Sequence, residues 1–178
     1  MQARGPLMME HRLIEKMLAV IQSALERTAQ TQSIDPYFVD TVVDFIQVYA
    51  DRTHHGKEED VLFKNLRMKG LSHDDAQLMN ELIEEHVFGR QTTKALVEAN
   101  ARYRKGNGTA LAEVTARLKT LVDLYPKHIN KEDKTFFPAA QSYLSKEEDR
   151  AMIAEFWEFD RKMIQEKYKA VIKGFEGS

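Results

Sequence analysis

The chain has 178 residues, of which 43% are hydrophobic and 30% charged, with only 8 glycines and 4 prolines. This balance excludes a disordered or collagen-like chain and favours a helix-rich domain, and the length suits a single domain, residues 1–178. The 26 Lys and Arg residues nearly balance the 28 Asp and Glu residues, so the charge gives no indication of nucleic acid or an anionic membrane as a partner.

The sequence contains no cysteine, which excludes disulfides, zinc thiolates, iron–sulfur clusters and a cysteine nucleophile. A bound metal would therefore need nitrogen and oxygen ligands. The opening MQARGPLMMEH lacks the apolar run of a signal peptide, and no later segment is apolar over the length of a membrane span. We therefore expect a cytoplasmic protein without membrane contact.

Helical periodicity organises the first half of the chain. Apolar residues recur every three or four positions over about 6–30, which predicts a helix whose apolar face includes His11. The dipeptide DP at 35–36 offers an acidic cap followed by proline in the first turn. A second helix is expected from there to about residue 68, ahead of a glycine.

Further helices are expected in the second half. The sequence SHDD at 72–75 has the spacing of a capping box and predicts a third helix, which ends at KGNG, residues 105–108. A fourth helix follows over about 109–144, and Pro126 is expected to kink it because proline removes a backbone hydrogen bond. SKEE then predicts a shorter fifth helix over about 146–172.

Four long helices joined by short loops favour an all-α fold, an antiparallel up-down four-helix bundle over about residues 6–144. The fifth helix is expected to pack outside this bundle as an additional C-terminal helix. Its aromatic residues are interpreted as packing residues or as the contact surface of a homodimer: Phe156, Trp157 and Phe159.

Two segments of the expected bundle carry the same pattern. HHGKEEDVLF beginning at His54 and HINKEDKTFF beginning at His128 share the His, the Lys three later, the Glu four later and the Phe nine later. The dipeptide EH at 10–11 recurs at 85–86 with nearly the same offset. The chain therefore reads as two helical hairpins around a pseudo-twofold centre, which six residues are expected to line: His11, His54, Glu58, His86, His128 and Glu132.

The spacing suits a shared metal site. Residues four apart lie on one helix face, about 6 Å apart along the axis. In bundle metalloproteins the ligands project inward from all the helices, and a carboxylate can bridge two ions through its two oxygens. Four imidazoles and two bridging carboxylates therefore predict a dinuclear centre with two His per ion. Iron and manganese suit these ligands, and geometry does not exclude zinc.

Taken singly, each of these residues has a structural explanation. One His on an apolar helix face is commonly a hydrogen-bonded core residue, and polar pairs four apart commonly lie in solvent. Together, however, the carboxylates and imidazoles would be costly to bury unpaired, because ions resist transfer from water. A bound cation removes this conflict, so metal binding explains the whole set.

Other polar residues are expected to lie outside the centre. His55 and Glu59 repeat the spacing one position on, turned by about 100° from the first pair. We expect them at the rim of the site or in its outer shell, although a register shift of one residue would exchange them with His54 and Glu58. His73 lies in a cap sequence and is expected to be solvated.

These segments resemble the hemerythrin-like family (HHE cation-binding domain), a four-helix bundle with a non-heme di-iron centre. The resemblance covers about residues 7–145 and rests on EHRLIEKML, HHGKEEDVLF, EEHVFGR and HINKEDKTFFP. It implies two iron ions joined by an oxo or hydroxo bridge. By matching motifs, it implies one ligand from each of the first and third helices and a His–Glu pair from each of the others: His11, His86, His54 with Glu58, and His128 with Glu132.

The chain departs from the oxygen carriers of this family in one respect. Those proteins have two His four apart on the third helix, whereas neither neighbour of His86 at that spacing is a His. A fifth imidazole is therefore missing unless His55, Glu85 or Tyr125 takes its place. With two His per iron, both ions keep an open or water-filled position, which favours reaction with small molecules over reversible carriage.

The resemblance implies a protein that binds or senses a small diatomic molecule such as dioxygen or nitric oxide. The alternative is a di-iron enzyme or iron-delivery protein on the same scaffold, which consumes peroxide or nitric oxide or supplies iron for cluster repair. A third hypothesis is a helical interaction module that binds no metal. Binding without catalysis is the first expectation, and the sequence leaves the physiological ligand, the redox partner and the oligomeric state open.

Overall fold

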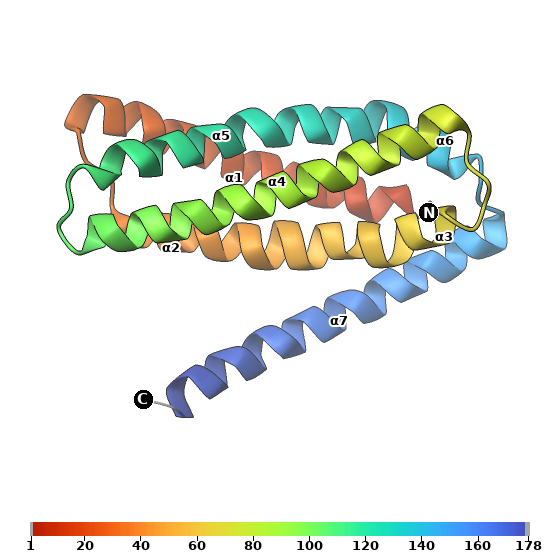
Figure 1. Ribbon diagram of the computed structural model, residues 1–178. Helices are drawn as coiled ribbons and strands as arrows, with labels where there is room; N and C mark the ends of the chain where they lie inside the picture. Colours follow the sequence, from red (N-terminus) through yellow and green to blue (C-terminus); the bar gives the residue numbers. More distant parts are fainter. Residues whose placement is uncertain (1, 177–178) are drawn as a thin grey trace.

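The computed structural model describes residues 2–176, and the side chains of residues 2–173. Four rods run antiparallel to form a bundle, and a further helix begins at one end of the bundle and runs obliquely to the rods (Figure 1). The helices, in chain order and with π-helical stretches labelled η, are α1 (Arg4–Thr31); α2 (Pro36–Asp44), η1 (Phe45–His55), η2 (Glu58–Phe63) and α3 (Lys64–Leu66); α4 (His73–Arg104); α5 (Ala110–Lys131), η3 (Glu132–Phe136) and α6 (Phe137–Gln141); and α7 (Lys146–Glu176). The expected all-α bundle with an additional C-terminal helix is confirmed.

Local sequence signals set where several rods begin. The Asp35 side chain accepts a hydrogen bond from the Tyr37 N–H at the start of α2, and the Ser72 hydroxyl accepts one from the Asp75 N–H at the start of α4. Each bond satisfies a backbone donor that has no partner inside its helix. The α5 helix continues through Pro126 to its end at Lys131.

The structure differs from the expected uniform α-helices where the repeated motifs lie. The second rod is π-helical in η1 and η2, and the fourth is π-helical in η3. In η1 the Thr53 hydroxyl donates to the Val48 carbonyl five residues earlier. Because a turn closed by i→i+5 bonds holds more residues than an α-turn, neighbouring side chains are rotated by less than about 100°. Adjacent residues in these stretches can therefore share one face.

The apolar core is divided into two clusters along the bundle. One cluster surrounds Leu18, Leu96 and Leu118, toward the end where α1 meets α2. The other surrounds Phe63 and Phe136, toward the N-terminal end of α1. The predicted ligands lie between the two clusters in sequence on every rod, except that Ile129 of the first cluster follows His128. Apolar layers therefore separate that level of the bundle from both ends.

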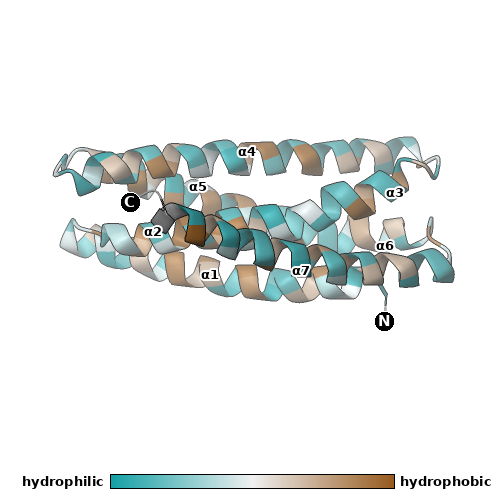
Figure 2. Cartoon of the chain, turned by 90° about the horizontal axis from the view of Figure 1, so that it is seen from below, coloured by the Kyte–Doolittle hydropathy of each residue, from teal (hydrophilic) through white to brown (hydrophobic). Residues whose placement is uncertain are grey.

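The α7 helix packs against η1 and η2 and crosses the bundle on the side where α1 and α2 lie (Figure 2). Phe156 of α7 is buried and Phe159 packs against the core, as expected for packing residues, whereas Trp157 is exposed. The helix extends to Glu176, beyond the expected end near residue 172, and residues 177–178 of the expected frayed tail lie outside the described residues.

None of the helices within residues 2–176 combines the length and the apolar character needed to span a membrane.

Replacing Leu118 by Ala is expected to lower the free energy of unfolding by about 2 to 5 kcal/mol, because this side chain is fully buried and its removal leaves a cavity. Urea unfolding followed by circular dichroism measures the loss. Leu13→Ala, at an exposed position, is the matched control and is expected to change the free energy by less than about 0.5 kcal/mol. Equal losses for the two variants would contradict this description of the core.

Candidate metal centre

The six residues singled out by the repeat converge inside the bundle. They come from α1, the second rod, α4 and the fourth rod, so every rod of the bundle contributes at least one. None of their side chains is more than 3% exposed: His11, His54, Glu58, His86, His128 and Glu132. The sequence pattern therefore located a buried polar layer correctly, whereas the ligand role of these residues stays a prediction.

Glu58 lies between the two halves of the repeat. One of its oxygens, Oε1, is 3.4 Å from His54 Nε2, and the other, Oε2, is 3.4 Å from His86 Nε2. Because the two oxygens face imidazoles from different hairpins, this carboxylate occupies a bridging position.

Glu132 occupies the corresponding position from the other side. Its Oε2 lies 3.2 Å from both His11 Nε2 and His128 Nε2. Its Oε1 lies 4.0 Å from His86 Nε2. Both halves of the repeat thus supply one carboxylate that faces imidazoles of both halves.

The structure places His55 differently from our expectation. His55 was expected at the rim or in the outer shell, with a role as the missing ligand left open, but it is 3% exposed and its ring stacks on that of His86 with 3.8 Å between centroids. The expectation assumed α-helical geometry, and the wider π-helical turn of η1 lets His54 and His55 both point inward. Two groups of converging ligand atoms result: His55, Glu58, His86 and His128, and His11, His54, Glu58 and Glu132.

The other residues considered as a fifth ligand are engaged elsewhere. Glu85 accepts hydrogen bonds from His128 Nδ1 and from the Lys131 ammonium. The Tyr125 ring lies nearly parallel to that of His55, with 6.0 Å between centroids. His55 is therefore the additional imidazole at the centre, while His73 is exposed as expected.

Outer carboxylates orient the imidazoles. The Nδ1–H groups of four rings donate to carboxylates over 2.8–2.9 Å: His11 to Asp133, His54 to Glu10, His86 to Glu59 and His128 to Glu85. His55 Nδ1 lies 3.5 Å from Asp51. Ionised carboxylates only accept hydrogen bonds, so each donating ring keeps its proton on Nδ1 and turns the Nε2 lone pair inward.

These outer acids adjoin the predicted ligands in sequence but serve a different rod. Glu10 precedes His11 and accepts from His54, while Glu85 precedes His86 and accepts from His128. In the same way Glu59 and Asp133 follow the inward-facing glutamates and accept from imidazoles of other rods. Glu59 was expected in the outer shell, but the other acids were missed. Their recurrence in the repeat was the available signal.

A third layer of cations neutralises the outer acids. Arg12 pairs with Asp133, Lys57 with Glu10, and Lys131 with Glu85. Arg90 pairs with both Glu59 and Asp51. Lys57 is the most enclosed of these cations, because its side chain is fully buried.

Among residues 2–173, whose side chains the structure describes, the innermost atoms find no protein partner. His11 Nε2, His54 Nε2 and both oxygens of Glu58 and Glu132 are buried without a hydrogen bond. His86 Nε2 and His128 Nε2 lie 3.1 Å apart, but both rings carry their proton on Nδ1, so two lone pairs face each other. Native structures rarely leave buried acceptors unpaired. Bound cations would satisfy all of them, and the nitrogen and carboxylate donors fit iron, manganese or zinc.

Burial shifts the protonation of the centre toward uncharged groups. It lowers the pKa of His54, His55 and His86 well below their usual value, and nearby imidazoles add to this effect. It raises the pKa of Glu58 and Glu132 well above the usual carboxyl value. These three imidazoles are thus neutral and able to bind a metal, while a metal must displace protons from the two carboxyls.

A sequence model described as hemerythrin HHE cation binding domain matches residues 5–140. Comparisons with curated proteins and with solved structures gave no significant match. The matched segment includes all seven inward-facing residues and ends before α7 begins. The chain therefore belongs to the hemerythrin HHE cation-binding domain family.

Proposed function

We propose that this protein is a non-heme di-iron protein that binds or senses a small diatomic molecule, dioxygen or nitric oxide. The observation that carries the proposal is the pair of buried ligand groups that share Glu58. Two groups with a common carboxylate are the arrangement that a dinuclear centre requires, since the carboxylate can bind one ion through each oxygen. Iron, when bound, would supply the electrons and the open coordination position for the small molecule.

The two halves of the proposed centre are unequal. One ion would be held by His55, His86 and His128, and the other by His11 and His54. Glu58 belongs to both ligand groups, and Glu132 belongs to the group with His11 and His54. This division replaces the expected two imidazoles per ion with three and two.

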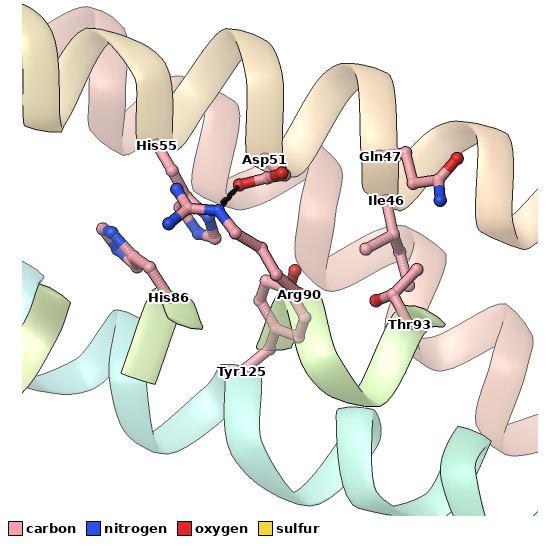
Figure 3. Close-up of a pocket in the computed structure, with 8 residues that line it drawn as sticks. All are labelled: Ile46, Gln47, Asp51, His55, His86, Arg90, Thr93 and Tyr125. Atoms are coloured by element: carbon pink, nitrogen blue, oxygen red, sulfur yellow. Dashed lines mark hydrogen bonds and ion pairs between the residues drawn. The ribbon is translucent and has the colours of Figure 1, made fainter. Parts of the chain in front are cut away.

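A cavity of about 230 Å³ leads to the proposed centre. Its lining residues come from the second rod, α4 and α5 (Figure 3): Ile46, Gln47, Asp51, His55, His86, Arg90, Thr93 and Tyr125. Gln47 is exposed and lies at the solvent side, while His55 and His86 belong to the centre. The cavity volume is ample for a diatomic molecule, so we propose that the ligand enters here.

The polar lining of this cavity supports the enzyme alternative. Arg90 donates to Asp51 across the cavity wall (Figure 3). Burial raises the pKa of Tyr125 above its usual value, so its hydroxyl keeps its proton and can donate a hydrogen bond. Such donors beside a bound small molecule would assist its reduction. Rapid mixing of the anaerobically iron-loaded protein with dioxygen separates the two functions: a persistent new absorption supports binding, and its rapid decay supports consumption.

Metal-free protein is expected to lose stability toward both acid and alkaline pH. Below about pH 6.5 the imidazoles of the unfolded chain take up protons, whereas the buried imidazoles of the folded chain stay neutral. Their contribution to stability therefore falls on acidification by up to about 1.4 kcal/mol per pH unit for each imidazole. From about pH 4.5 upward, Glu58 and Glu132 hold protons in the folded state only, so their contribution to stability falls as pH rises through their raised pKa values. Above about 6.5 the imidazoles no longer offset this loss.

Thermal melting of metal-free protein between pH 4.5 and about 8.5 measures this profile. Metal loading is expected to abolish the decline on the alkaline side, because the ions replace the displaced protons. Glu58→Gln should weaken the same decline without metal. A stability that rises steadily from pH 5 to about 8 in metal-free protein would contradict the assignment of these protons.

His55→Ala is expected to remove or weaken one of two bound ions, because His55 belongs to only one of the two ligand groups. Elemental analysis after anaerobic iron loading should give two ions per chain for the original protein and about one for the variant. His73→Ala, at an exposed position, is the control and should retain both ions. If His55→Ala retained both ions, His55 would not be a metal ligand and would only line the cavity. If the original protein bound no metal, the proposed function would be refuted.

Gln47→Trp is expected to slow nitric oxide binding several-fold, since the larger side chain narrows the mouth of the cavity. Stopped-flow absorption of the anaerobically iron-loaded protein measures the association rate. Gln91→Trp adds the same ring at an exposed position of α4 outside the cavity and should leave the rate unchanged. Equal rates for both variants would show that the ligand uses another route.

A further inference from the structure

The two halves of the repeat differ in how they complete their third layer. In the second half Lys131 pairs with Glu85 and with Glu81, both on α4 and one helical turn apart. In the first half the corresponding Lys57 pairs with Glu10 of α1 and with Asp160 of α7. The residue of α1 that corresponds to Glu81 is Pro6, four before Glu10. The α7 helix therefore supplies an acid that α1 lacks.

Apolar contacts hold α7 directly on the motif. A Cβ atom added to Gly56 would lie 2.7 Å from Cζ of Phe159, so this glycine permits the close approach of α7. The Lys57 ammonium lies 5.9 Å from the ring centroid of Phe156, also on α7. The residue that corresponds to Gly56 in the second half is Asn130, which is exposed. Only the first half is covered in this way.

A continuous chain of polar contacts runs from α7 to the centre. Asp160 Oδ1 accepts a hydrogen bond from Lys57 Nζ over 2.6 Å. Lys57 also donates to Oε1 of Glu10, whose Oε2 accepts from His54 Nδ1 over 2.9 Å. Lys57 is fully buried, whereas Lys131 is 27% exposed, so water screens the first chain less than its counterpart.

We propose that Asp160 is a positioning residue for the His11 and His54 half of the centre, acting through Lys57 and Glu10 on His54. Asp160 shares the Lys57 ammonium with Glu10, so Glu10 keeps more negative charge for the hydrogen bond from His54. Without Asp160, Lys57 would pair with Glu10 alone. The hydrogen bond between Glu10 and His54 would then weaken, and His54 Nε2 would become less basic. This inference rests on the proposed metal function, and it makes α7 a part of the metal site although the family match ends before it.

Asp160→Asn tests the inference while conserving the size of the side chain. In metal-free, ¹⁵N-labelled protein, the His54 Nδ1 proton is expected to exchange with solvent several-fold faster, and the His128 Nδ1 proton at an unchanged rate. Anaerobic titration with Co²⁺ as the probe metal is expected to show up to about tenfold weaker binding at one of two sites, with a change in the visible spectrum of that site only. Asp160→Glu should restore both values.

Two control variants separate positioning from mere docking of α7. Glu166→Gln breaks the exposed pair that joins α7 to Arg52 and should change neither His54 exchange nor the Co²⁺ spectrum. Glu81→Gln removes the exposed partner of Lys131 and should leave His128 exchange unchanged, because solvent screens that pair. If Glu166→Gln has the same effect as Asp160→Asn, or if Asp160→Asn leaves His54 exchange unchanged, the inference is overturned.

The two proposals fail differently. If the original protein binds no Co²⁺ or iron, the proposed function fails, yet the exchange of the His54 proton still shows whether Asp160 acts on His54. If the original protein binds two ions and Asp160→Asn alters neither the exchange nor either site, the role of Asp160 fails and the metal centre stands.

Discussion

The main constraint on this bundle is the burial of two carboxylates and five imidazoles in one layer between two apolar clusters. Their inward atoms have no protein partner, and the lone pairs of several face one another across about the width of an ion. A purely apolar layer would stabilise the bundle more simply. Bound cations would resolve the conflict, because facing lone pairs would then form bonds to the metal, and the family to which the chain belongs is a cation-binding one.

The surroundings of this layer are organised outward by alternating charge. Imidazoles donate to acids, and the acids accept from arginines and lysines nearer the surface. Four of the outer acids belong to a different rod from the imidazole that donates to them, so these bonds also hold the rods in register. Glu10 shows both roles, since it orients His54 and neutralises Lys57. Buried charge is thus compensated in pairs at each step away from the centre.

The pseudo-twofold pattern of the sequence is broken in two places, and both breaks affect the centre. The first is His55, which adds an imidazole to one half and lines the cavity. Its Nδ1 lies 3.5 Å from Asp51, whereas the Nδ1 atoms of the other four rings lie 2.8–2.9 Å from their outer carboxylates. The second is α7, which covers Lys57 while Lys131 stays partly exposed. The proposed ions would therefore differ both in their ligands and in their shielding from water, which suits a centre where one ion meets the added molecule.

Periodicity and local hydrogen bonding were enough to predict the rods, the caps at Asp35 and Ser72 and the convergence of six polar residues. The position of His55 could not be predicted in this way, because a π-helical turn is stabilised by packing between rods and leaves the three-and-four spacing of apolar residues unchanged. The tertiary structure decided this position, and it also decided which rod each outer acid serves and that α7 buries Lys57. Such pairings depend on distances between segments far apart in the chain, which no local pattern encodes.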